Sequence, residues 1–107
     1  MRYKSNIPRI QRQLEQNKKA ALEAIGVFVK GEAEVRAPVD TGRLAGSIDY
    51  RRAGDNKVVI GTPVEYAPYV EFGTSKMRAQ PYLRPALDDN RKRIKELAEQ
   101  YLGRGIK

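Results

Sequence analysis

The sequence predicts an α+β fold, in which a long N-terminal helix and a C-terminal amphipathic helix pack on a small antiparallel β-sheet. Apolar residues recur at helical spacing near both ends of the chain, and the middle holds two short strand-like segments around the turn-forming "GDN" of 54–56. At 107 residues the chain is long enough for one domain with a small core. We therefore expect a single domain over 1–107.

The N-terminal helix is expected over 7–37. Pro8 stands near its predicted start, where the missing N–H costs nothing, and Pro38 ends it because the residue before a proline avoids the α conformation. Gly26 and Gly31 inside it either allow close packing or mark a bend. The apolar positions follow spacings of three, four and seven, at Ile7, Ile10, Leu14, Ala21, Ile25, Phe28 and Val35.

The region 44–62 is expected to form a β-hairpin, with strands at about 47–53 and 57–62. The preceding "DTGR" of 40–43 predicts a turn, because Asp caps backbone N–H groups and Gly tolerates positive φ. Two strands alone are marginally stable in water. Their apolar face must therefore lie on the long helix, or join a larger sheet, including one completed by another subunit.

The segment 63–82 is rich in aromatic residues and proline. It predicts a short helical turn over 68–73 and an irregular loop over 74–80, with a further strand over 76–80 left open. We expect Met77 to be far more exposed than Tyr69, because the aromatic residues are expected to anchor the segment to the core. These residues are Tyr66, Tyr69, Phe72 and Tyr82.

The last helix is expected over 83–102, starting near Pro85 and ending before Gly103. Asp88 and Asp89 are expected in its first turn, where the helix dipole favours negative charge. The basic run 91–95 is then mostly a solvated face, balanced by pairs at i and i+4. The expected pairs are Asp88 with Lys92, Asp89 with Arg93, Lys92 with Glu96, and Lys95 with Glu99.

The composition excludes several classes of site. Without cysteine or histidine there is no disulfide, no thiolate metal site and no imidazole base. The "GTSK" of 73–76 lacks the second glycine and the residue order of a phosphate loop, and no acidic spacing fits calcium or magnesium. Glu65 and Glu71 are expected to be solvent-facing partners of Arg78 or Arg84. We expect no catalytic, cofactor-binding or metal-binding residue.

The charge balance points to an anionic partner. Lys and Arg number 21 against 13 Asp and Glu, a net charge of +8 with a pI near 9.9, so the long-range field attracts polyanions such as nucleic acid. Solubility, or pairing with an acidic subunit, explains the same excess. No run is apolar enough for a membrane span or a secretory signal, so we expect a soluble protein that is not exported.

Two separated motifs carry a family resemblance. The segments "APVDTGRLAGSI" (37–48) and "VVIGTPVEYAPYVEFGTSKMRAQPYLRPAL" (58–87), followed by an amphipathic helix, resemble the small head-tail joining and tail-completion proteins of long-tailed double-stranded DNA bacteriophages. The characteristic family residues correspond here to Asp40, Thr41, Gly42, Tyr66, Tyr69, Val70, Glu71, Gly73, Thr74, Pro81, Leu83, Arg84 and Pro85. Phe72 and Tyr82 are added as structural residues of the same motif.

The resemblance implies a non-enzymatic virion protein, made in the host cytoplasm and without a cofactor. It would form a homo-oligomeric ring, usually six-fold, at the neck, where it completes the tail, joins it to the head and contacts connector and tail proteins. Which neck position it takes, as completion factor, stopper or terminator, stays open. The alternative is a free-standing basic nucleic-acid-binding module; a small hydrolase using carboxylates is disfavoured because histidine is missing.

Two sets of contact residues follow from the resemblance. The loop is expected to touch neighbouring subunits through Gly73, Thr74, Ser75, Lys76, Met77 and Arg78. DNA in the ring lumen would be held non-specifically through its phosphates. Two basic groups are candidates for that role: Arg51, Arg52 and Lys57 on the hairpin, or Arg2, Lys4, Arg9 and Arg12 at the N-terminal end.

Overall fold

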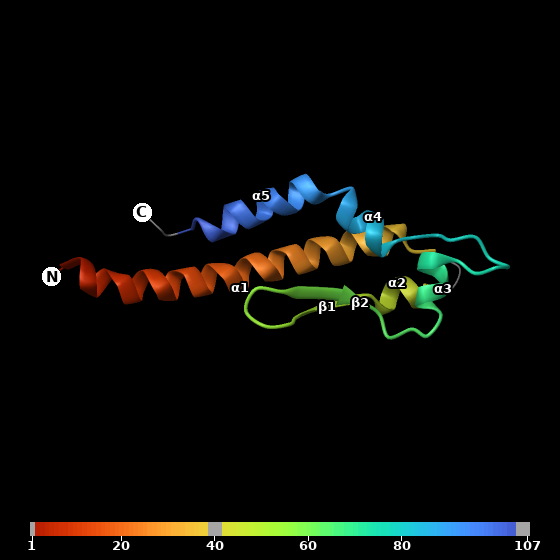
Figure 1. Ribbon diagram of the computed structural model, residues 1–107, viewed down its shortest axis with the longest axis horizontal. Coiled ribbons are helices and arrows are strands. Elements are labelled where there is room, and N and C mark those ends of the chain that lie inside the picture. The colour runs from red at the N-terminus through yellow and green to blue at the C-terminus, as the bar shows by residue number, and fades with distance from the viewer. Residues whose placement is uncertain (1, 39–41, 105–107) are drawn as a thin grey trace.

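A single long helix, α1 (Arg2–Arg36), forms the axis of the molecule. The computed structural model describes residues 2–38 and 42–104, with side chains from residue 7 onward. The chain is elongated, 69 × 24 × 21 Å, because the other elements pack on the C-terminal part of α1 and its N-terminal part extends beyond them (Figure 1). We call residues 2–16 the α1 arm.

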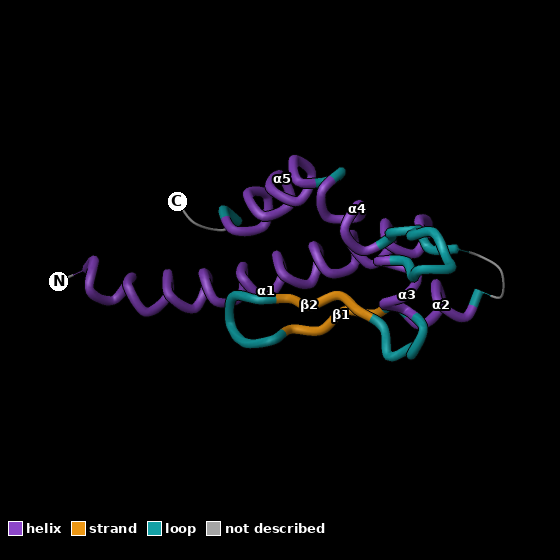
Figure 2. Tube along the Cα trace, turned by 45° about the vertical axis from the view of Figure 1, so that its right-hand side comes forward, coloured by secondary structure: helices purple, strands orange, loops and turns teal. Residues whose placement is uncertain are grey.

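The remaining elements lie on two sides of α1. A short helix α2 (Arg43–Ser47) leads into strands β1 (Asp49–Arg52) and β2 (Val58–Gly61), and α3 (Ala67–Phe72) follows. The chain then forms α4 (Leu83–Asp88) and α5 (Arg91–Leu102). The hairpin runs along one side of α1 and α5 returns along the other (Figures 1 and 2). The predicted α+β class, with a helix at each end, is confirmed.

The sheet has two antiparallel strands, β1 and β2, in which Tyr50 pairs with Ile60 and Arg51 with Val59. In the described part of the chain no strand forms over 76–80, so the further strand is not observed. Backbone groups around that segment are bonded locally: the Thr74 N–H donates to the Met77 carbonyl at 2.9 Å, and the Gln80 N–H to the Val70 carbonyl at 2.8 Å. The segment is therefore a closed loop.

The core lies between the C-terminal half of α1 and the segments that cross it. Small residues on α1 let these elements approach closely, and the Tyr50 ring lies where a Cβ on Gly26 would be, so Gly26 serves packing rather than a bend. The buried cluster consists of Val29, Ala33, Ala37, Leu44, Ile48, Val64, Ala67, Tyr82 and Ala86. One tyrosine, Tyr82, is its largest member.

The α1 arm differs from the expectation in where the helix starts, and it carries an exposed apolar row. The helix begins at Arg2 rather than near residue 7, which places Pro8 in its second turn. The apolar row of the arm is exposed: Ile7, Ile10 and Leu14 keep 48%, 38% and 41% of their surface accessible. The helical spacing of this row is as predicted, and the row is exposed because no other described element extends alongside the arm.

The predicted single helix over 83–102 is wrong. It divides into α4 and α5 at 89–90, where Asn90 caps the carbonyl of Ala86 through its side chain at 3.0 Å. Asp88 and Asp89 thus lie at the end of α4, not in a first turn. Asp88 pairs with Arg84 and Arg91, and Asp89 with Arg36 on α1. Of the four expected pairs, the described residues form Lys95 with Glu99.

Candidate interaction surfaces

Glu71 is a buried carboxylate that holds α3 to the start of α4. Its Oε1 accepts the backbone N–H groups of Tyr82 at 3.1 Å and Leu83 at 2.9 Å, and its Oε2 accepts that of Arg84 at 3.3 Å. These are N–H groups at the N-terminus of α4, which have no partner within that helix. The expectation of a solvent-facing Glu71 is therefore wrong: its charge is compensated by backbone donors.

The loop after α3 has a fixed base and an exposed tip. Gly73 adopts φ +77°, and a Cβ there would stand 2.8 Å from the Ala79 nitrogen and 2.9 Å from the Met77 oxygen, so only glycine fits without a shift. The candidate interface residues beyond it, Thr74 to Arg78, are all exposed. The structure thus presents this loop on the surface at the end of the molecule opposite the α1 arm (Figure 1).

The aromatic residues divide differently from the prediction. Tyr82 is fully buried and Tyr66 is half-buried beneath the guanidinium of Arg43, 5.4 Å from the ring centre. Tyr69 and Phe72 are 57% and 76% exposed, so they do not anchor the segment to the core. A six-residue helix buries one stripe, and α3 buries Ala67 and Glu71.

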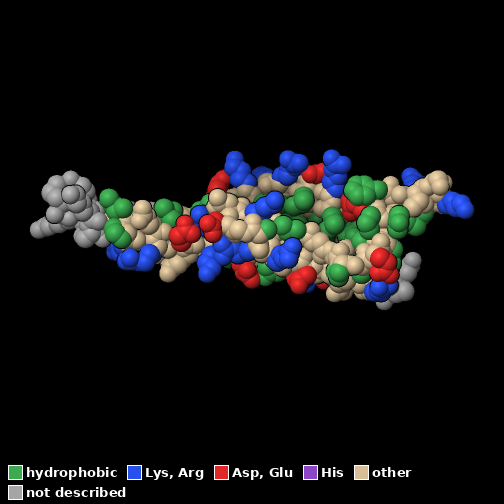
Figure 3. Space-filling view, turned by 60° about the horizontal axis from the view of Figure 1, so that its bottom comes forward, with side chains coloured by type: hydrophobic (Ala, Val, Ile, Leu, Met, Phe, Trp, Pro, Cys, Tyr) green, Lys and Arg blue, Asp and Glu red, His purple; other side chains and the backbone are tan. Residues whose placement is uncertain are grey.

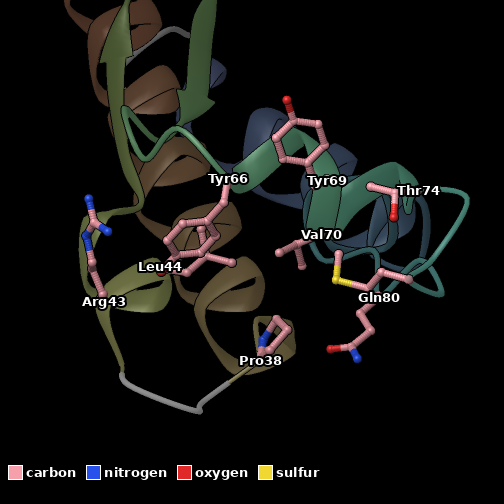
Figure 4. Close-up of a pocket in the computed structure, with 9 residues that line it drawn as sticks. Pro38, Arg43, Leu44, Tyr66, Tyr69, Val70, Thr74 and Gln80 are labelled. Atoms are coloured by element: carbon pink, nitrogen blue, oxygen red, sulfur yellow. The ribbon is translucent and has the colours of Figure 1, made fainter.

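The predicted order of exposure is also reversed. Met77 is 40% exposed, less than Tyr69. Met77 lines a cavity. The Tyr69 ring, in contrast, extends away from the other labelled side chains (Figure 4). Sequence pattern could not find this result, because the spacing of Tyr69 and Phe72 at i and i+3 places them on one face of α3 and does not say whether that face is covered.

The cavity that Met77 helps to line, which we call the α2–α3 cavity, has a volume of about 710 Å³. It opens between the end of α1, α2 and α3, and its walls are mostly apolar (Figure 4). Arg43 stands at its edge and pairs with Glu65 at 3.2 Å. A backbone N–H and the Arg43 charge lower the pKa of Glu65, which stays ionised. The lining residues include Pro38, Leu44, Tyr66, Val70 and Met77.

A second hollow, the α3–α4 groove, lies on the other side of α3 and has a volume of about 640 Å³. Its apolar wall is formed by Val64, Pro68, Phe72, Leu83 and Leu87. Phe72 and Leu87 are exposed there, and Glu65 lines its edge. Figure 3 shows hydrophobic side chains gathered at this end of the molecule and again on the α1 arm.

The two candidate groups of DNA-contacting residues lie in different places. Arg51 and Lys57 are exposed on the hairpin, while Arg52 is half-buried and donates to the Gly54 carbonyl. Arg9 and Arg12 are exposed on the α1 arm; the Arg2 and Lys4 side chains fall outside the described part. The hairpin turn reaches the base of the arm, where Lys18 donates to the Asn56 side chain at 3.2 Å. The hairpin group therefore lies beside the middle of α1, and the N-terminal group lies further along the same helix, on the arm.

The remaining motif residues have mixed positions. Asp40 and Thr41 lie outside the described residues, whereas Gly42 adopts φ +72°, as the predicted turn requires. Pro81 is exposed, and Leu83 and Pro85 are half-buried. Within the described residues, no set of acidic side chains could hold a metal ion, and no helix combines the length and apolar character needed to cross a membrane.

Comparison with known proteins places most of the chain within one family model. The model, described as "Bacteriophage HK97-gp10, putative tail-component", matches residues 2–73. The match therefore covers α1, the hairpin and α3. Searches of the curated proteins and of the solved structures returned no match.

Proposed function

Because the chain belongs to the HK97-gp10-like family of bacteriophage tail components, we propose that it is a structural subunit of the neck of a long-tailed phage. In this proposal copies form a ring, six-fold in the expected arrangement, that completes the tail and joins it to the head. The ring contacts the adjacent connector and tail proteins, and DNA passes through its lumen. The protein acts through its surfaces rather than through catalysis.

The observation that carries the proposal is the presence of two unlike apolar surfaces at opposite ends of an elongated subunit. One is the row of Ile7, Ile10 and Leu14 on the α1 arm; the other surrounds α3, where Tyr69 and Phe72 are exposed. A ring built head to tail requires each subunit to present two different, complementary patches. Contiguous apolar patches on the surface of a protein commonly mark sites where another molecule binds.

DNA contact in the lumen is part of the same proposal. A channel of lysine and arginine would hold phosphates without reading bases, so binding would weaken steeply with salt. Substituting glutamine for both Arg51 and Lys57, and separately for both Arg9 and Arg12, compares the two basic groups at equal charge loss. The group that faces DNA should show the larger loss of DNA retention in assembled particles.

The test of the function uses a phage that encodes this chain, with the gene deleted and then supplied in trans. We expect deletion to leave heads and tails unjoined in electron micrographs, and the wild-type gene to restore joined particles that contain the protein. Fully infectious, properly joined particles without the protein would contradict the proposal.

The net charge of +8 favours a second function, a free-standing nucleic-acid-binding module. It requires the purified chain to bind DNA by itself, with log affinity falling linearly against log salt. Filter binding at two salt concentrations distinguishes this module from the neck subunit. Absence of binding at low salt would eliminate it.

A further inference from the structure

We propose that an exposed basic row on the N-terminal part of α1, formed by Arg9, Arg12 and Lys19, binds the phosphate backbone of duplex DNA. The inference rests on the proposed neck function, which leaves open whether this part of α1 or the hairpin faces the DNA. It follows from the distribution of charge along the chain, from the absence of acidic partners for the row among the described residues, and from the side of the helix on which the row lies.

The excess positive charge is concentrated at the start of α1. Residues 2–19 hold six of the 21 Lys and Arg residues but only one of the 13 acidic residues, Glu15. They therefore carry five of the eight net positive charges, although they make up about a sixth of the sequence. A charge excess of this density on one element attracts polyanions.

The three cations of the basic row are available to a ligand. Arg9, Arg12 and Lys19 are exposed, and none of them forms an ion pair with another residue of the described part of the chain; Glu15 pairs with Lys18 instead, at 3.2 Å. Figure 3 shows Lys and Arg side chains along one edge of the arm. The row spans about 15 Å of helix. Each DNA strand presents a phosphate about every 3.4 Å of its axis, so the row is long enough to contact several.

The basic row lies on the side of the helix away from the apolar row of the arm. At 3.6 residues per turn, the mean directions of the two rows differ by about 180°. A helix that lies in a lipid surface buries its apolar face and reaches the headgroups with cations near the edges of that face. Cations on the far side favour a polyanion that meets the basic side alone, and they leave the apolar row available for protein contacts.

The hairpin is a weaker candidate for the same ligand. It holds three basic residues but also two exposed acids, Asp49 and Asp55. Arg52 is half-buried, and its guanidinium donates to a backbone carbonyl. The net charge of the hairpin is therefore +1, against +5 for residues 2–19. DNA is attracted more strongly to the start of α1.

Tethered cleavage of the DNA tests the assignment, because the chain has no cysteine and one introduced thiol can carry an iron chelate that cuts nearby DNA. Gln16→Cys places the chelate on the basic side, between Arg12 and Lys19, and Val59→Cys places it on the hairpin. Both native side chains are exposed and uncharged. In particles assembled with each labelled variant, we expect several-fold stronger cleavage from position 16 than from position 59.

The outcomes separate the DNA contact from the neck function. Cleavage from Val59→Cys that equals or exceeds that from Gln16→Cys would assign the DNA to the hairpin and overturn the inference. Particles that contain the labelled proteins but show no cleavage from either position would also overturn it, and would leave the neck function standing. Particles that are joined and infectious without the protein would overturn the neck function, and the DNA contact with it.

Charge substitution gives a second measurement. A double variant with glutamine at Arg9 and Arg12 removes two cations per copy, whereas lysine at both positions keeps the charge. We expect the glutamine variant to release DNA from particles at a lower salt concentration than the wild type, and the lysine variant to match the wild type, because non-specific phosphate binding depends on charge. Circular dichroism verifies that both variants fold.

Three results of this comparison would contradict DNA binding by the row. Equal early release from both variants would mean that the arginines act through their geometry and not their charge. Release from the glutamine variant at the wild-type salt concentration would mean that the row does not hold DNA. A folded glutamine variant that no longer enters particles would mean that the row binds an acidic protein surface instead.

Discussion

The carboxylate of Glu71 accepts the backbone N–H of Leu83 at 2.9 Å, and this bond joins two short helices that the chain separates by a ten-residue loop. The same side chain also accepts the N–H groups of Tyr82 and Arg84. Hydrogen bonds to an ionised acceptor are stronger than those between neutral groups. Glu71 therefore fixes the angle between the two walls of the α3–α4 groove.

We expect Glu71→Ala to lower the free energy of unfolding by about 2–4 kcal/mol, because it leaves buried N–H groups without an acceptor. Glu71→Gln keeps one acceptor oxygen and should recover part of the loss. Urea denaturation measures both. Glu65→Ala is the matched control, since that carboxylate is exposed and should matter little. Equal stability of the Glu71→Ala and Glu65→Ala proteins would contradict the structural role of Glu71.

The two glycines of α1 should respond to alanine in opposite directions. At Gly26 a Cβ would overlap the Tyr50 ring, so we expect Gly26→Ala to displace the hairpin and destabilise the protein by about 1–3 kcal/mol. At Gly31 nothing lies within 4 Å, and Gly31→Ala should stabilise α1 by about 0.5–1 kcal/mol. Thermal unfolding of the two variants compares the signs. Stabilisation by both substitutions would mean that Tyr50 does not pack against Gly26.

Sequence periodicity was sufficient for the helical and hairpin elements but not for their burial. Ile7, Ile10 and Leu14 follow the same spacing as the buried part of α1, and only the position where α5 ends decides that they are exposed. The division between α4 and α5 was missed for a similar reason, because the apolar spacing continues across Asn90. Periodicity reports the face of a helix and not which neighbour covers it.

The candidate surfaces were predictable only in part. The exposed loop beyond Gly73 was expected from its irregular composition, and its exposure is observed. The burial of Glu71 was not predictable, because its donors lie 11 to 13 residues away and are backbone groups without a residue signature. Tyr69 and Phe72 were assigned to the core because aromatic residues are usually buried, whereas α3 is too short to bury more than one stripe.

Tyr82 offers a test of how the core is stabilised. Its ring is fully buried, and its hydroxyl makes no hydrogen bond to any described residue. Burial, and then the charge of Glu71, raises the pKa of this phenol, which stays protonated at neutral pH. We expect Tyr82→Phe to change the free energy of unfolding by less than about 1 kcal/mol, and Tyr82→Ala to lower it by about 3–5 kcal/mol.

Urea denaturation of the two Tyr82 variants gives the comparison. The phenylalanine variant is the control for the ring, because it removes the hydroxyl and keeps the packing. A large loss in Tyr82→Phe would mean that the hydroxyl has a partner, and would contradict stabilisation by ring burial alone.

The contact between Tyr50 and Glu23 should make attachment of the hairpin depend on pH. The Tyr50 hydroxyl donates to the Glu23 carboxylate, and this bond, with desolvation and the Glu23 charge, raises the pKa of Tyr50 above its ordinary value of 10.0. A raised pKa in the folded state means that the contact stabilises the protein fully below the unfolded pKa and is lost as pH rises through the folded pKa. Ultraviolet titration of the tyrosines should therefore show raised midpoints for Tyr50 and for Tyr82, and Glu23→Gln should lower the midpoint of Tyr50 alone. Tyr50→Phe should remove that phenol from the titration and flatten the dependence of stability on pH above about 10. A titration curve unchanged by Glu23→Gln would show that the carboxylate does not hold the Tyr50 proton, and that the hairpin is attached to α1 by packing against Gly26.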